Sequence, residues 1–125
     1  MDTSVELPAR PTSAGEARRF AARVLQQWSV GPEMCDIVVL LVSELVTNAI
    51  LHAGLEFTLE IERHQPDRIR VKVFDPSPSP VQPRHFTTEA GTGRGFMLIE
   101  ALSIDWGWEA TPDGKLVWFE VGSDS

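Results

Sequence analysis

The sequence predicts an α+β fold, a two-layer sandwich in which helices cover one face of a mostly antiparallel sheet. Three patterns support this prediction: segments with apolar residues at helical spacing, two pairs of alternating segments, and a short turn within each pair. A chain of 125 residues fits one domain. We therefore expect residues 1–125 to form a single unit, with its core at about 12–121.

A short strand and a helix are expected at the start of the chain. Residues 5–7 alternate between apolar and polar before Pro8, which predicts a strand at the edge of the sheet. A helix over 12–28 follows, with apolar residues every four positions. Thr12 or Ser13 is expected to cap this helix, and Glu16 is spaced to form a capping box with Ser13.

The middle of the chain predicts a long helix and a hairpin. The strongest helical pattern covers 33–53 and stops before Gly54, the residue type most common just after a helix. Residues 55–63 and 69–75 then alternate between apolar and polar on either side of a turn at 65–67. This arrangement is typical of two antiparallel strands, each with one buried face.

The last part of the chain predicts a loop, a helix and a second hairpin. Residues 76–92 hold four of the nine prolines and are expected to form a loop. A helix opened by glycines is expected over 95–102. Strands are expected over 104–109 and 116–121, joined by a turn at 112–115.

The composition narrows the function classes. The formal net charge is −7, with 11 basic and 18 acidic residues, which argues against direct nucleic-acid binding through a broad phosphate contact. The charge suits either a partner with a basic surface or simple solubility. Cys35 is the only cysteine, so no disulfide within the chain and no cysteine-cluster metal site is expected. No signal peptide and no segment of membrane-spanning length is expected, which predicts a cytoplasmic protein.

Polar residues interrupt the apolar face of the long helix. Glu44, Asn48 and His52 lie four residues apart and therefore follow one line along the helix. A carboxylate at the edge of a packed face costs several kcal/mol unless it is paired, hydrogen-bonded or facing a wet cavity. His52 is best explained as a group near the helix end, whereas Glu44 and Asn48 can both reach one ligand. A transition-metal site such as a zinc site made of all three residues fits these ligands poorly, because asparagine is a weak ligand for such metals. Magnesium fits better, since it binds few protein groups together with substrate phosphates.

Two further motifs could bind a ligand. Asp75 closes an apolar strand, where it either begins a turn or accepts a hydrogen bond from a purine amine. The run 91–96, Gly-Thr-Gly-Arg-Gly-Phe, precedes a helix and would let phosphate approach the backbone of Gly93, Arg94 and Gly95. Alone, such a run is more often a hinge. It matches neither the dinucleotide fingerprint nor the P-loop.

In this order, the three motifs resemble the N, G1 and G2 boxes of the GHKL (Bergerat-fold) ATPases, which have the histidine-kinase-like ATPase fold. The short chain and its ending, Gly-Lys-Leu-Val-Trp-Phe at 114–119, look most like bacterial anti-sigma-factor serine kinases. The resemblance implies ATP and Mg²⁺ as cofactors, with Asn48 as the Mg²⁺ ligand and Glu44 as the catalytic carboxylate. It also implies that Asp75 binds adenine, that the residues 93–95 bind phosphates, and that 76–92 forms a lid over ATP.

The same resemblance implies partners and leaves one alternative open. A sigma factor would be sequestered, an antagonist protein would be phosphorylated on serine, and a homodimer remains open because relatives are dimeric. The alternative is a regulatory binding module of the same fold with little or no ATP turnover. Two departures from the family pattern favour it: prolines follow Asp75 at 76 and 78, and Leu116 stands where many relatives carry threonine.

Overall fold

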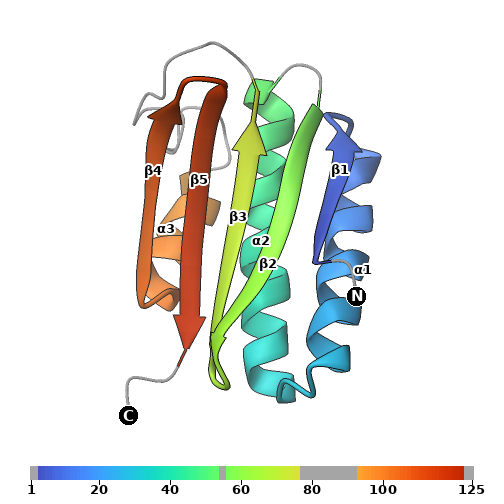
Figure 1. Ribbon diagram of the computed structural model, residues 1–125, viewed down its shortest axis with the longest axis vertical. Helices are drawn as coiled ribbons and strands as arrows, with labels where there is room; N and C mark the ends of the chain where they lie inside the picture. The colour runs from blue at the N-terminus through green and yellow to red at the C-terminus, as the bar shows by residue number, and fades with distance from the viewer. Residues whose placement is uncertain (1–2, 54–55, 77–92, 123–125) are drawn as a thin grey trace.

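The structure, a computed structural model, describes residues 3–53, 56–76 and 93–122. It confirms the predicted α+β sandwich: a five-stranded antiparallel sheet carries helices on one face, as Figure 1 shows. The strand order is β1-β2-β3-β5-β4. In chain order the elements are β1 (Ser4–Pro8), α1 (Thr12–Gln27), α2 (Pro32–Ala53), β2 (Glu56–Gln65), β3 (Arg68–Asp75), α3 (Gly93–Leu102), β4 (Asp105–Thr111) and β5 (Gly114–Gly122).

The start of α1 differs from the prediction, although the helix itself lies where it was expected. Ser13 does not form a capping box with Glu16: no side chain caps the helix, and Pro11 occupies the capping position. Instead, Ser13 is buried, and its hydroxyl donates a 2.6 Å hydrogen bond to the carbonyl oxygen of Pro8 at the end of β1. A contact between two elements has therefore taken the hydroxyl that the local pattern assigned to the helix.

The core lies between the sheet and the helices. Alternate residues of β2, β3 and β5 point toward the helices, and all of them are buried over the central part of each strand. They are Phe57, Leu59, Ile61, Ile69, Val71, Val73, Val117, Phe119 and Val121. The residues of α2 that pack in the same core are Val38, Leu41, Val42, Leu45 and Val46. Period-2 alternation in the strands and helical spacing in α2 thus meet in one apolar layer.

The expectation about membrane-spanning length is wrong for α2. By length and composition, the segment Pro32–Leu51 is apolar enough to cross a membrane. The core helix of a soluble protein passes the same test, because a helix covered on several sides needs apolar residues around much of its circumference. In Figure 1, α2 lies against the middle of the sheet with α1 and α3 on either side of it.

The antiparallel order brings several chain segments to one end of the molecule. The end of β3 lies beside the beginning of β5, and Asp75 is paired with Lys115 in the register. The last turns of α2 and the first turn of α3 lie at this end as well (Figure 1). The α3 helix begins at Gly93, two residues earlier than expected, so the glycine run forms part of its first turn.

Candidate functional site

A buried pair of opposite charges lies at the end of the sheet. Asp75 is 5% exposed and Lys115 is 7% exposed. Both residues continue the phase of the buried strand residues, so their side chains point from the sheet toward the helices. The Lys115 Nζ lies 3.5 Å from the Asp75 Oδ2. A carboxylate and an ammonium group are therefore held where the sheet meets the helix layer.

The ammonium group of Lys115 is not fully satisfied by its neighbours. Its Nζ is buried and makes no hydrogen bond within the part of the chain that the structure describes. An ion pair without a hydrogen bond leaves donors of a buried ammonium without acceptors, which is unfavourable unless another group supplies them. A ligand with acceptor atoms, such as a purine ring nitrogen or a phosphate oxygen, would fit this position.

Lys115 is a candidate site residue that the sequence did not predict. The turn at 112–115 and the resemblance of 114–119 to a family ending assign it no role. The signal was present in the alternation: Lys115, Val117, Phe119 and Val121 share one phase, and three of the four are apolar. A lysine in the apolar phase of a strand is rare unless it is paired or functional.

Glu44 and Asn48 lie one turn apart on the half of α2 that approaches this end. Both side chains are half-buried. Their neighbours Ser43 and Thr47 are bonded within the protein: Arg18 donates to the Ser43 hydroxyl, and the Thr47 hydroxyl donates to the Ser43 carbonyl. No side-chain hydrogen bond or ion pair holds Glu44 or Asn48 among the described residues. Their polar groups are thus available to a ligand or to solvent.

The remaining predicted site residues are placed less completely. Gly93, Arg94 and Gly95 form the first turn of α3, but the Arg94 side chain lies outside the described part. The side chain of His52 also lies outside it, although His52 itself belongs to α2. The predicted lid falls beyond Pro76, at residues 77–92, and lies outside the described residues as well.

The donor set suits magnesium with a phosphate ligand better than a protein-only metal site. Among the described residues there is no group of three or more His, Cys, Asp or Glu side chains that could hold a metal ion. Mg²⁺ keeps several waters and binds through one or two protein groups together with substrate phosphates. The half-buried amide of Asn48 is a ligand of that kind, with Glu44 one turn away.

Among the described residues, two groups have shifted pKa values, and both lie away from this end. Hydrogen bonding from His64 lowers the pKa of Glu62 despite partial burial, and Lys72 lowers it further. Glu62 accepts these bonds on the sheet face opposite the helices, at 2.9 Å from His64 and 3.1 Å from Lys72. Burial, with a smaller effect of Asp36, raises the pKa of the half-buried Cys35 thiol. Neither group belongs to the candidate site.

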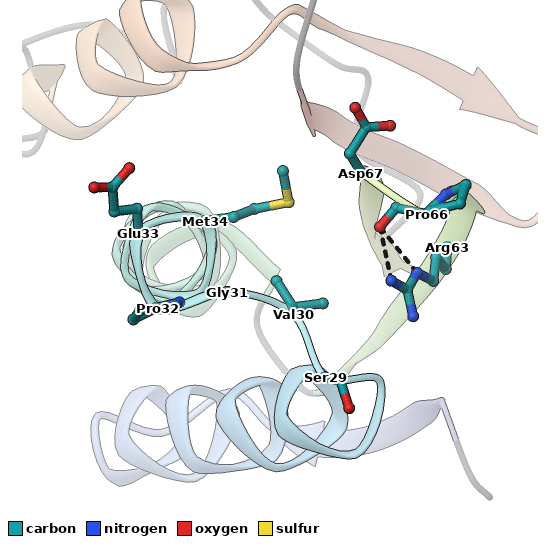
Figure 2. A pocket seen from close by; sticks show the side chains of 9 residues that line it. All are labelled: Ser29, Val30, Gly31, Pro32, Glu33, Met34, Arg63, Pro66 and Asp67. Atoms are coloured by element: carbon teal, nitrogen blue, oxygen red, sulfur yellow. Dashed lines mark hydrogen bonds between the residues drawn. The ribbon is translucent and has the colours of Figure 1, made fainter.

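A hollow of about 430 Å³ lies at the opposite end of the sheet. It is formed by the connection between α1 and α2 and by the turn between β2 and β3, as Figure 2 shows. The Arg63 guanidinium is bound by backbone there: it donates to the Pro66 carbonyl at 3.2 and 2.7 Å and to the Trp28 carbonyl at 2.7 Å. Arg63 thus ties the two connections together, and none of the predicted site residues lines this hollow.

Comparison with known proteins identifies the class of this fold and site. Residues 7–121 match the model of the histidine kinase-like ATPase domain. The match covers most of the chain, so the chain belongs to the family of histidine-kinase-like ATPase domains, a class of ATP-binding domain. This confirms the GHKL resemblance at the level of the family. No curated protein matches the chain.

One solved structure illustrates the shared fold. The histidine kinase domain of the blue-light-activated histidine kinase from Erythrobacter litoralis EL346 is similar, with a TM-score of 0.55 and 17% sequence identity. The similarity covers 98% of this chain and 64% of that chain. At this identity the likeness concerns the fold, and it confirms the histidine-kinase-like ATPase architecture predicted from the sequence.

Proposed function

We propose that this protein binds ATP with Mg²⁺ and acts in the cytoplasm as an anti-sigma factor with protein serine kinase activity. The observation that carries the proposal is the meeting of Asp75, Lys115 and the Glu44–Asn48 half of α2 at one end of a histidine-kinase-like ATPase domain. The partners proposed are a sigma factor, which is sequestered, and an antagonist protein, which is phosphorylated on serine.

The residues suggest a division of tasks. Asp75 would accept a hydrogen bond from the exocyclic amine of adenine, and the buried Lys115 ammonium would donate to an acceptor of the same nucleotide. Asn48 would hold Mg²⁺, which neutralises phosphate charge when it is bound. The backbone of the first turn of α3, at 93–95, would bind phosphate at the positive end of the helix.

Glu44 is proposed as the catalytic carboxylate. It lies one helical turn from Asn48, and no other side chain among the described residues holds it in a hydrogen bond or ion pair. The carboxylate would accept the proton of the attacking serine hydroxyl as the new oxygen–phosphorus bond forms and the bond to the ADP leaving group breaks. A lost general base of this kind reduces the rate by about 10²–10⁴-fold.

A second candidate function is favoured by the Asp75–Lys115 pair. Lys115 lies 3.5 Å from the carboxylate that would bind adenine, so the pair can stabilise the fold without a nucleotide. The prolines at 76 and 78 also remove backbone N–H donors that a lid would use for phosphate. In this alternative the domain sequesters its partner as a regulatory module, with little or no ATP turnover.

Calorimetric titration with ATP, with and without Mg²⁺, separates these functions at the binding step. The proposal predicts binding that strengthens with Mg²⁺, and it predicts that Asn48→Ala abolishes the strengthening. Gln27→Ala, which removes an exposed amide from α1, is the matched control and is expected to keep it. Mg²⁺-dependent binding that persists in Asn48→Ala would exclude the proposed metal ligand.

Phosphate transfer is tested with radiolabelled ATP and a panel of antagonist proteins. Glu44→Ala is expected to bind ATP normally while labelling falls by about 10²–10⁴-fold. Asp36→Ala removes an exposed acid from the same helix and is expected to label like the wild type. If the wild-type protein binds ATP and labels no antagonist, the kinase is excluded and the regulatory module remains.

A further inference from the structure

The free edge of β1 and the adjacent face of α1 form a surface that the nucleotide site does not use. β1 is the first strand in the sheet order, so among the described residues one of its two edges has no neighbouring strand. Figure 1 shows α1 lying behind β1 at this border of the molecule. Between the two elements lies a groove of about 210 Å³, lined by Val5, Leu7, Glu16, Arg19, Phe20 and Arg23.

The backbone of β1 offers hydrogen-bonding groups along this edge. The Ile61 N–H donates to the Thr3 carbonyl at 2.8 Å, so odd-numbered residues of this segment direct their N–H and C=O groups toward β2. Those of Ser4 and Glu6 therefore point outward. The outward carbonyl of Pro8 is already used, because it accepts from the Ser13 hydroxyl and from the Arg10 N–H. A short extended segment could pair with Ser4 and Glu6.

The side of the groove formed by α1 carries two arginines, one glutamate (Glu16) and the apolar Phe20, so its net charge is positive. Arg19 and Arg23 are exposed, lie one turn apart and make no ion pair among the described residues. The Arg19 guanidinium folds back over Gly15, where an added Cβ would lie 3.3 Å from its Nη1. Val5, Leu7 and Phe20 form the apolar part of the groove. A strand added to β1 would place every second side chain beneath these arginines.

We propose that this surface docks an extended acidic segment of a partner protein, which adds to β1 as a sixth strand. Backbone pairing with Ser4 and Glu6 would give general affinity, as in other cases of strand addition. Specificity would come from a carboxylate that reaches Arg19 or Arg23 and an apolar side chain that fills the groove beside Phe20. The site requires neither ATP nor the kinase activity proposed above.

Charge decides against a second copy of this chain as the occupant. Pairing of two β1 edges would extend both sheets and bring two α1 helices side by side on the same face. On the side that lines the groove, the helix carries Arg19 and Arg23 against Glu16, so the two helices would approach with like net charge. An acidic segment meets the same surface with opposite charge.

Selection of short random peptides displayed on phage provides the test. The wild-type protein serves as bait, with counter-selection on the doubly substituted Arg19→Glu/Arg23→Glu protein. We expect enriched peptides with a carboxylate and an apolar residue two positions apart, on the same side of a strand. Titrated as synthetic peptides, they should bind the doubly substituted protein about tenfold or more weakly. Thermal unfolding of each variant verifies that it is folded.

A proline substitution tests strand addition itself. Glu6→Pro removes an outward N–H without removing a hydrogen bond to β2, and we expect it to weaken peptide binding. Glu6→Ala keeps the N–H and should bind the peptides normally. Hydrogen exchange of the Glu6 amide in the wild-type protein should slow on peptide binding, a readout that does not depend on the proline variant folding. The proposal is overturned if no peptide is enriched over the counter-selection bait, if the Glu6 amide stays unprotected, or if sedimentation shows self-association through β1.

Discussion

Gly114 is the position where a single added carbon should disturb the candidate site most directly. It precedes Lys115 at the start of β5 and has a φ of +157°, a conformation that residues with a Cβ rarely adopt. A Cβ added there would lie 2.1 Å from the carbonyl oxygen of Asp75 and 2.7 Å from the Cα of Pro76. Both neighbours are backbone atoms and cannot rotate away. Gly114→Ala must therefore push β5 away from the end of β3.

The expected loss of stability follows from these two effects. Overpacking of a well-packed contact typically costs about 1–3 kcal/mol, and an unfavourable backbone conformation adds about 1 kcal/mol or more. The sum is a loss of about 2–4 kcal/mol in the free energy of unfolding. For a chain of this length, about 1 kcal/mol corresponds to roughly 4 °C in Tm, so the Tm should fall by about 8–16 °C.

Thermal and urea unfolding monitored by circular dichroism measure this change. Gly31→Ala is the matched control, because a Cβ at Gly31 would meet no atom within 4 Å. It should change the unfolding free energy by less than about 1 kcal/mol, and a gain is expected because alanine restricts the unfolded chain. Equal Tm values for Gly114→Ala and Gly31→Ala would refute the reasoning. They would show that β5 can move away from the end of β3 without a loss in the free energy of unfolding.

Three further predictions concern charges. Asp75→Asn should weaken the binding of ATP by about tenfold or more and the binding of GTP far less, because the carboxylate can accept a hydrogen bond from the adenine amine, whereas guanine presents a carbonyl at that position. Equal losses of affinity for the two nucleotides in calorimetry would exclude this role. Lys115→Met should lower the free energy of unfolding by about 3 kcal/mol, because it removes the positive charge that lies 3.5 Å from the buried Asp75 carboxylate. The double variant with Asp75→Asn should recover most of this loss in urea unfolding, and no recovery would show that the pair is not coupled. Glu62→Gln should lower the unfolding free energy by about 0.5–1 kcal/mol at neutral pH. Since the folded pKa of Glu62 lies below its ordinary value of 4.5, this stabilisation is present above that value and is lost as the pH falls through the folded pKa. The wild type and Glu62→Gln should therefore converge in acid unfolding, and a difference that persists there would contradict the assignment.

The spacing of apolar residues predicted the helices and strands well wherever it matches the face that the element buries in the structure. The helices α1 and α2 and the strands of both hairpins lie close to the predicted ranges, because their periodicity reflects the face that each element buries. The capping box at Ser13 failed for the opposite reason. Its hydroxyl had two potential partners, one within α1 and one at Pro8, and only the packing of β1 against α1 decides between them.

The candidate site shows the same division. Glu44, Asn48 and Asp75 could be named from the sequence, because polar residues within apolar patterns are conspicuous and their order resembles a known family. Lys115 was missed, because its importance depends on its strand neighbour. The sequence predicted two hairpins, but it contained no signal for how they join in the sheet.

The sequence alone predicted the class of fold, the positions of most elements and three polar residues of the candidate site. These predictions rest on residue spacing within single segments and on the order of the motifs. The tertiary structure decided that β5 pairs with β3, so that Lys115 meets Asp75 in a buried position. It also left β1 at the border of the sheet with two arginines beside it. Both outcomes depend on contacts between segments far apart in the chain, and these are set by the packing of the whole core rather than by any local pattern.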